Sequence, residues 1–229
     1  MNISLGVDVG STTAKIVVLR EDTPVFSRYA RHYSQIRDTV TAMLRDAADA
    51  LAELSIPADT PIATAMSGSA GMGLAEAAGI PFVQEVWATG QVVRRLEPDT
   101  DAVIELGGED AKILFFGDSV DERMNGACAG GTGAFIDQMA TLLDMTPDAL
   151  DEASLHYEKL YPIASRCGVF AKSDVQPLLN QGARKEDVAA SIYQAVVNQT
   201  ISGLAQGRRI TGKIMFLGGP LSFCRGLRN

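Results

Sequence analysis

Two cysteines stand in glycine-rich loops that each lead into a predicted helix. Cys128 lies in the run Asn125–Phe135, which has glycines at 126, 130, 131 and 133, and Cys167 directly precedes Gly168. Glycines let the backbone turn sharply and expose N–H groups, and a helix start adds the positive end of its dipole. Such surroundings stabilise a thiolate, so the two loops predict a shared site for reactive or metal-binding thiols. For either cysteine alone, a small buried hydrophobe is the alternative.

A polar turn near the start of the chain, between two apolar β-rich segments, suits the oxygens of a phosphate. Gly10 permits the tight turn, and Lys15 adds a cation beside it. The hydroxyl side chains of the turn, next to exposed backbone N–H groups, are those of Ser11, Thr12 and Thr13. Asp8 is expected to face a magnesium ion, usually through water. An ordinary hairpin with a polar turn is the alternative for this motif taken alone.

An internal repeat favours the phosphate interpretation. Residues 7–19 align without a gap on residues 104–116, so that an acid, a turn glycine, an alanine and a lysine coincide in kind or identity. The second turn contributes Glu105, Gly107, Gly108, Glu109, Asp110 and Lys112. The repeat distance is too long for a solenoid. It predicts two related lobes, residues 1–98 and 99–229, whose polar turns clamp a polyphosphate and its metal.

Hydrophobic periodicity places further elements around these turns. Helices are expected at 34–54, 73–78, 87–96 and 184–205, and strands at 61–66, 80–86 and 213–217. Trp87 is expected to be a packing residue. The pair Gly218–Gly219 follows the last strand and would allow a nucleoside to approach the backbone closely. Lobe 2 should therefore carry both a phosphate turn and a nucleoside turn.

The amino-acid composition limits the classes of partner that the protein can be expected to bind. The chain has 229 residues, with 20 Lys and Arg against 28 Asp and Glu, and a formal charge of −8. That balance argues against nucleic acid or an anionic membrane as the main partner, and no signal or membrane segment is evident, so a cytoplasmic location is expected. Three cysteines are too few for a disulfide framework. His32 and His156 have no metal-ligand spacing.

Together the motifs resemble those of the actin, sugar-kinase and Hsp70 ATPase superfamily. Asp8–Lys15 resembles its first phosphate motif, Glu105–Asp110 the second, and Leu217–Gly219 the adenosine motif. Within it, Asn125–Phe135 and Ser165–Phe170 are similar to the activators of 2-hydroxyacyl-CoA dehydratases and the ATPase components of benzoyl-CoA reductase, the BadF/BadG/BcrA/BcrD type. The resemblance implies an α/β, actin-like (ribonuclease H-like) fold of two related lobes, each with a mixed sheet flanked by helices.

The resemblance also implies a function. Such activators form homodimers that hold one 4Fe-4S cluster between the subunits, and they use ATP hydrolysis to send a low-potential electron to a partner enzyme. Cys128 and Cys167 would then ligate iron, and ferredoxin or flavodoxin would supply electrons. A catalytic role, with Mg²⁺, is implied for Asp8, Glu105, Glu109 and Asp110. ATP or ADP contacts are implied for the glycines and hydroxyls of both turns, for Lys15, and for Gly131, Thr132, Gly218 and Gly219.

The chain departs from the family pattern at several places. Glu105 stands where the superfamily often has Asp, and Glu109 where activators more often have Gln. Cys224 lies outside the pattern and is expected to be a free thiol. The sequence ends soon after the adenosine motif, so a fragment of a longer protein is expected. A sugar or small-metabolite kinase of the same fold, and a nucleotide-binding assembly protein like actin, are the alternatives.

Overall fold

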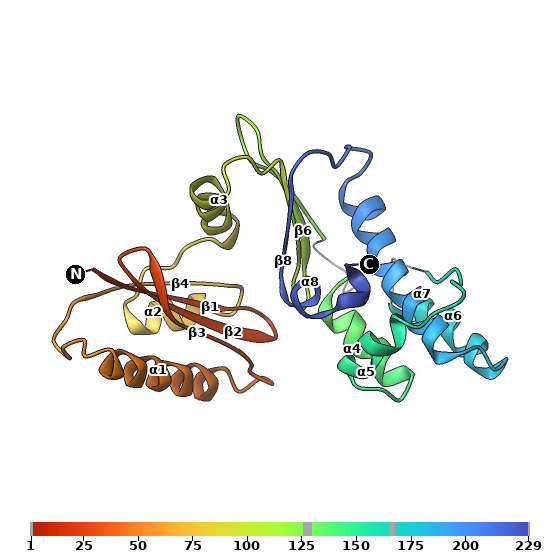
Figure 1. Ribbon diagram of the computed structural model, residues 1–229, viewed down its shortest axis with the longest axis horizontal. Coiled ribbons are helices and arrows are strands. Elements are labelled where there is room, and N and C mark those ends of the chain that lie inside the picture. The colour runs from red at the N-terminus through yellow and green to blue at the C-terminus, as the bar shows by residue number, and fades with distance from the viewer. Residues whose placement is uncertain (1, 126–129, 165–167, 229) are drawn as a thin grey trace. The chain divides into compact units, whose positions relative to one another are not determined.

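The computed structural model describes residues 2–125, 130–164 and 168–228 (Figure 1). By its internal contacts the chain divides into two units, Met1–Gln91 and Val92–Asn229. The division falls inside the helix α3 (Glu85–Leu96), whereas the sequence placed the lobe boundary after residue 98. Each unit is built around its own four-stranded sheet.

The sheet of unit 1 has the order β3-β2-β1-β4. Its strands are β1 (Ile3–Val9), β2 (Thr13–Arg20), β3 (Thr23–Arg31) and β4 (Ile62–Ser67). The first three are antiparallel neighbours, and β4 runs parallel to β1. The helix α1 (Ile36–Glu53) lies along one face of the sheet and buries Val40, Met43 and Ala47 in the core of this unit (Figure 1).

The segment after β4 differs from the sequence prediction. The short helix α2 (Met72–Ala78) forms as expected, but the strand predicted at 80–86 is wrong. Only one bridge, between Met66 and Phe82, joins this stretch to β4, and Pro81, which has no N–H to donate, can offer only its carbonyl to Met66. The chain then enters α3, on which Trp87 is 60% exposed, so it does not pack in the hydrophobic core of either unit.

The sheet of unit 2 repeats the same topology, in the order β7-β6-β5-β8. Its strands are β5 (Ala102–Leu106), β6 (Ala111–Phe115), β7 (Asp121–Met124) and β8 (Ile214–Leu217). Again three strands are antiparallel neighbours and the last, β8, runs parallel to the first. Each sheet is therefore mixed, which confirms the predicted architecture of two related lobes.

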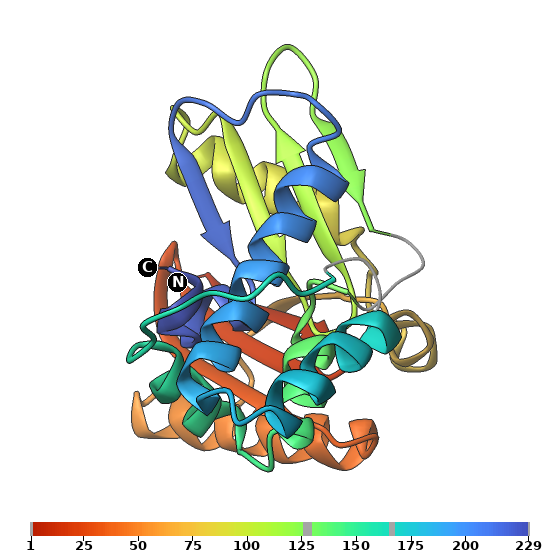
Figure 2. The ribbon, with the colours of Figure 1, turned by 90° about the vertical axis from the view of Figure 1, so that its right-hand side faces the viewer.

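Helices of unit 2 share one hydrophobic core with its sheet. They are α4 (Gly133–Leu142), α5 (Pro147–Ser154), α6 (Gly168–Asn180), α7 (Lys185–Asn198) and α8 (Gly219–Phe223), with a 3-10 turn η2 (Arg225–Leu227). The long helix predicted at 184–205 is α7 followed by a π-helical segment, η1 (Gln199–Leu204). In Figure 2 this rod, in blue, crosses the sheet, and η1 contacts β6. Phe135, Ile192 and Val196 join Ile113 in the core.

Candidate functional site

The first predicted phosphate turn begins at a paired acid and lysine. Asp8 and Lys15 stand opposite one another across β1 and β2, with Lys15 Nζ 2.6 Å from Asp8 Oδ2. Ser67 at the end of β4 donates its hydroxyl to the other oxygen, Asp8 Oδ1, over 3.3 Å. Burial lowers the pKa of Lys15. The charge of Asp8 and the hydrogen bond to it raise the pKa by more than burial lowers it, so the net pKa lies above its ordinary value. Lys15 is thus held as a cation at the base of the turn.

The turn itself closes in the way the sequence predicted. The N–H of Gly10 donates to the carbonyl of Thr13 over 2.9 Å, which reverses the chain. Ser11 and Thr12 are partly exposed at the tip, whereas Thr13 is buried. Two of the three predicted hydroxyls are therefore accessible to a ligand.

His32 belongs to this turn, although its sequence position gave no hint of it. The ring Nε2 lies 3.1 Å from the carbonyl oxygen of Gly10, and the His32 N–H donates to the carbonyl of Thr12 over 3.2 Å. The residue is 4% exposed. It follows β3, which pairs with β2 with Thr13 opposite Arg31. Extending the predicted hairpin by a third antiparallel strand would have placed residue 32 beside residue 12.

The second turn reproduces the first. Glu105 and Lys112 stand opposite one another across β5 and β6, as Asp8 and Lys15 do in unit 1. The N–H of Gly107 donates to the carbonyl of Asp110 over 2.8 Å, which corresponds to the Gly10–Thr13 bond. Because both the register and the turn bond repeat, the aligned residues occupy equivalent places in their two sheets.

Lys112 brings together two of the predicted catalytic acids. Its side chain is 2% exposed, and its Nζ lies 3.7 Å from Glu105 Oε2 and 3.2 Å from Asp110 Oδ2. The two carboxylates offset the charge of the buried ammonium group. Glu109, the remaining predicted acid, is exposed within the turn. Glu105 and Asp110 therefore form one cluster with Lys112, while Glu109 faces solvent.

The helix α4 is attached directly to the second turn. Its first residue, Gly133, donates its N–H to the carbonyl of Gly107 over 2.9 Å, and Ala134 donates to the carbonyl of Gly108 over 2.7 Å. Unsatisfied N–H groups at a helix start thereby find partners in the turn. The helix that follows the Cys128 loop is thus hydrogen-bonded to the predicted phosphate site.

Gly131 and Thr132, both predicted to contact the nucleotide, lie inside unit 2. Thr132 has no exposed surface, and Gly131 is buried beneath the side chain of Gln199 in η1. A side chain on Gly131 would begin 3.2 Å from Gln199 Cγ. Both residues are therefore buried within unit 2 and are not exposed at its surface.

The predicted adenosine turn also has a counterpart in unit 1. Gly218 follows β8 with a φ of 93°, and a Cβ there would lie 2.0 Å from the carbonyl oxygen of Leu106. Gly68 follows β4 with a φ of 91°, and a Cβ there would lie 2.3 Å from the carbonyl oxygen of Val9. Only glycine combines this backbone conformation with such a close approach. Gly219 follows as the first residue of α8.

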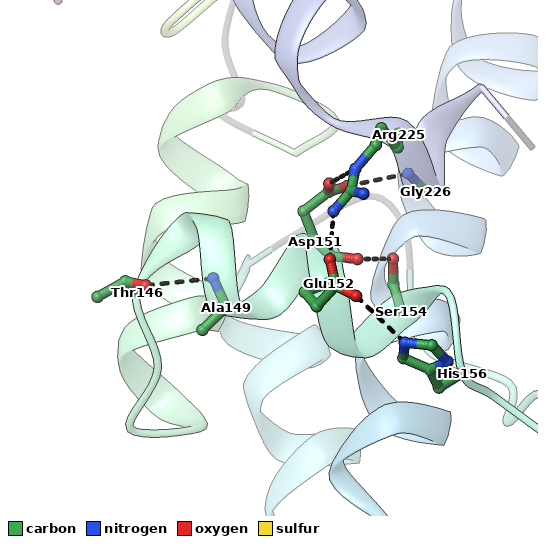
Figure 3. Close-up of polar contacts among 8 residues, drawn as sticks. All are labelled: Thr146, Ala149, Asp151, Glu152, Ser154, His156, Arg225 and Gly226. Atoms are coloured by element: carbon green, nitrogen blue, oxygen red, sulfur yellow. Dashed lines mark hydrogen bonds and ion pairs between the residues drawn. The ribbon is translucent and has the colours of Figure 1, made fainter.

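The segment after α8, residues 224–227, is called the strap here. It joins the adenosine turn to α5 through hydrogen bonds and ion pairs (Figure 3). Both oxygens of Asp151 are used, because Arg225 Nε binds Oδ2 over 3.0 Å and the Gly226 N–H donates to Oδ1 over 2.9 Å. Arg225 also pairs with Glu152, which in turn contacts His156. Asp151 is buried, so this anchor fixes the end of the strap firmly. His156 lies at the exposed edge of the cluster, as its lack of ligand spacing suggested.

Cys224 is a free thiol within this strap, as expected. Burial raises its pKa, and although the neighbouring Tyr193 hydroxyl acts in the opposite direction, the net pKa lies above the ordinary value. Burial and the neighbouring Cys224 raise the pKa of Tyr193 as well. Cys224 is therefore held as a neutral thiol, which suits packing and not metal binding.

Cys128 and Cys167, the predicted iron ligands, lie outside the described residues. The helices that follow them, α4 and α6, contact each other, and a Cβ on Gly168 would lie 3.2 Å from Gln138 Oε1 and 3.8 Å from Phe135. A side chain at position 168 would therefore fit tightly against α4. Within residues 2–125, 130–164 and 168–228, no group of three or more His, Cys, Asp or Glu side chains could hold a metal ion.

Known proteins match this geometry. Residues 5–223 match the BadF/BadG/BcrA/BcrD ATPase family. The (R)-2-hydroxyglutaryl-CoA dehydratase activating ATPase of Acidaminococcus fermentans is 28% identical over 94% of this chain and 82% of its own length. No helix in the described part of the chain has the length and apolar character to cross a membrane.

Two solved structures share the fold. The crystal structure of component A of the Acidaminococcus fermentans dehydratase superposes with a TM-score of 0.85 and 28% identity, covering 100% of this chain and 86% of that one. The 2-hydroxyisocaproyl-CoA dehydratase activator of Clostridium difficile, solved with bound ADPNP, gives a TM-score of 0.83 and 25% identity, covering 98% and 82%. Since the family match spans both hairpins, both cysteine loops and the adenosine turn, this chain belongs to the BadF/BadG/BcrA/BcrD ATPase family.

Proposed function

We propose that this protein is an ATP-hydrolysing iron-sulfur activator that delivers a low-potential electron to a 2-hydroxyacyl-CoA dehydratase or a benzoyl-CoA-reductase-like partner. One observation carries the proposal: the helix α4, which follows the Cys128 loop, donates its first two N–H groups to the second phosphate turn at Gly107 and Gly108. A nucleotide turn and a cysteine loop that share one helix are suited to link ATP turnover to a thiolate-bound cofactor. The relatives described above, an activating ATPase and a dehydratase activator, support the same role.

The nucleotide half of the site rests on the two equivalent turns. Backbone N–H groups and the hydroxyls of Ser11 and Thr12 would bind phosphate oxygens, and Lys15 would add a positive charge. Asp8 and Asp110 would hold Mg²⁺ or the attacking water, and the magnesium would supply charge neutralisation on the phosphates. The donors present fit this group, because each turn offers a carboxylate beside a lysine. The relative solved with ADPNP supports nucleotide binding.

The cluster half rests on Cys128 and Cys167. Four thiolates usually hold a four-iron cluster, and one chain offers two in matching loops, so a homodimer would complete the set. The packing of Gly168 against α4 fits this arrangement, since it brings the starts of α4 and α6 into contact. The cluster would supply one electron at low potential. Ferredoxin or flavodoxin would reduce it in the cytoplasm.

Iron content after anaerobic purification tests the proposal. The expected result is about four irons per dimer with brown colour, since one cluster of that type holds four irons. Replacing either Cys128 or Cys167 by Ala should remove the iron and leave ATP binding in place, because the phosphate turns lie on separate hairpins. Cys224→Ala is the matched control and should keep the iron.

A protein that stays free of iron after reconstitution with iron and sulfide would contradict the cluster. Steady phosphate release without an added acceptor is expected from an activator. Phosphate transfer to a sugar or small metabolite in an acceptor panel would instead support the kinase alternative.

A further inference from the structure

We infer that His32 is a positioning residue that orients the N–H groups of the first phosphate turn toward the nucleotide. The inference rests on the proposed ATP site and adds to it a residue outside the phosphate motif. Three contacts carry it: the ring to Gly10, the backbone to Thr12, and a bond from Ser34 that fixes the ring.

The first step is the direction of two peptide units. In a planar trans peptide the C=O and the following N–H point in opposite directions. His32 holds the carbonyl of Gly10 through its ring and the carbonyl of Thr12 through its backbone N–H. The N–H groups of Ser11 and Thr13 belong to the same two peptide units, so they point away from His32. That is the arrangement that binds an anion through backbone donors.

The second step is the state of the ring. The Ser34 N–H donates to Nδ1 over 3.2 Å, so Nδ1 carries no proton. The carbonyl of Gly10 can only accept, so Nε2 carries the proton and donates to it over 3.1 Å. Both contacts exist together only in the neutral ring with the proton on Nε2. The imidazole is buried, which shields this tautomer from solvent.

The third step is the backbone that presents Ser34 to the ring. Tyr33 and Ser34 both have positive φ, 45° and 64°, and the Gln35 N–H closes the turn on the His32 carbonyl over 2.6 Å. Neither residue is a glycine, so the turn is held in a conformation that L side chains disfavour. Strain of this kind persists where surrounding contacts determine it, and it gathers at functional sites.

In unit 2 the carbonyls of the equivalent turn are also hydrogen-bonded, but by other donors, and this supports the positioning role of His32. There the carbonyls of Gly107 and Gly108 are held by the Gly133 and Ala134 N–H groups. Gly107 occupies the place of Gly10, so both turns have their carbonyls anchored on the side away from the expected phosphates. In unit 1 the anchor is a single histidine.

Two substitutions separate positioning from mere packing. In His32→Gln the amide nitrogen reaches about as far as Nε2 and keeps the bond to Gly10, whereas in His32→Asn it reaches only to the place of Nδ1. The affinities to compare are those for Mg–ATP and for adenosine, which has no phosphate. We expect His32→Asn to weaken ATP binding about ten-fold or more, by the loss of oriented donors to a charged group, with adenosine affinity unchanged. His32→Gln should stay within about three-fold of wild type.

Tyr33→Phe is the control, because the Tyr33 side chain is exposed and the substitution leaves the backbone turn and the His32 contacts in place. It should leave ATP affinity unchanged. Equal losses for ATP and adenosine, or unchanged ATP affinity in folded His32→Asn, would overturn the inference. Wild-type protein that binds no ATP would overturn the proposed function, and the inference with it.

A measurement on the wild-type protein covers the case in which a variant does not fold. The chain has two histidines, so nitrogen NMR of the rings can be assigned with His156→Gln. We expect His32 to carry its proton on Nε2 with Nδ1 unprotonated. The opposite tautomer, or a ring protonated on both nitrogens at neutral pH, would overturn the inference independently of any binding result.

Discussion

The N–H of Gly133 lies 2.9 Å from the carbonyl oxygen of Gly107, and this bond joins the start of α4 to the second phosphate turn. The space around Gly133 is tight, since a Cβ there would lie 3.3 Å from that oxygen and 3.5 Å from Pro220 Cγ. Phosphate turn, adenosine segment and α4 therefore meet at one residue of unit 2.

Gly133→Ala should disturb this junction. The added methyl group should displace the Gly107 turn slightly and weaken ATP binding by about 1 kcal/mol, within the range for overpacking. Calorimetry with Mg–ATP measures it. Because the turn and the cysteine loop share α4, we expect the ATP and ADP forms to differ in the rate at which a chelator removes iron. This difference should shrink in Gly133→Ala. Gly73→Ala is the control, since its Cβ would meet nothing within 4 Å. Equal behaviour of the two variants would contradict a junction at Gly133.

Lys112→Met should destabilise unit 2. The substitution keeps most of the side-chain volume but leaves Glu105 and Asp110 without their buried cation. Removing one partner of a buried ion pair costs about 3–5 kcal/mol. Urea unfolding should show this as a lower midpoint, and Asp110 should then no longer be held for the nucleotide. A variant with wild-type stability would show that the two carboxylates do not depend on Lys112.

Gly226→Ala should loosen the strap shown in Figure 3. A Cβ at Gly226 would lie 2.1 Å from Ser154 Oγ and 2.6 Å from Tyr193 Cδ2, so the strap must shift and weaken its bond to Asp151. We expect a loss of about 1–3 kcal/mol in stability, the usual cost of overpacking. Thermal unfolding measures it. Gly182→Ala, at a position with open space but a φ of 78°, controls for the general cost of replacing a glycine.

The sequence revealed those parts of the site whose signals are local. Asp8 and Lys15 flank one turn, and Glu105 and Lys112 flank its repeat, so identity and spacing alone predicted both hairpins. The strand predicted at 80–86 failed because Pro81 cannot donate to a neighbouring strand and the chain turns into α3 within a few residues. Apolar residues alone could not distinguish these outcomes.

Contacts between distant residues could not be read from periodicity. His32 and Gly10 are 22 residues apart in the chain, and Arg225 and Asp151 are 74 residues apart. The pattern at 184–205 likewise continues through the change from α7 to the π-helical η1, and apolar spacing alone does not reveal that change. The side chain of Gln199, packed against Gly131 and Gly203, marks that change in the structure.

Cys224 should be unreactive at neutral pH. Burial raises the pKa of its thiol, so the thiolate, which is the reactive form, is scarce below that raised value. In the Cys128→Ala, Cys167→Ala double variant, alkylation by iodoacetamide should be slower than for free cysteine at pH 7.5, and its rate should rise with pH.

The raised pKa of Cys224 also predicts a pH dependence of stability. The neutral thiol is favoured in the folded state, so this contribution is complete below the ordinary thiol pKa and is lost as pH rises from there through the raised pKa. Unfolding midpoints should therefore fall more steeply in alkaline solution than those of the variant that also carries Cys224→Ala, and equal slopes would contradict a partly buried, neutral Cys224.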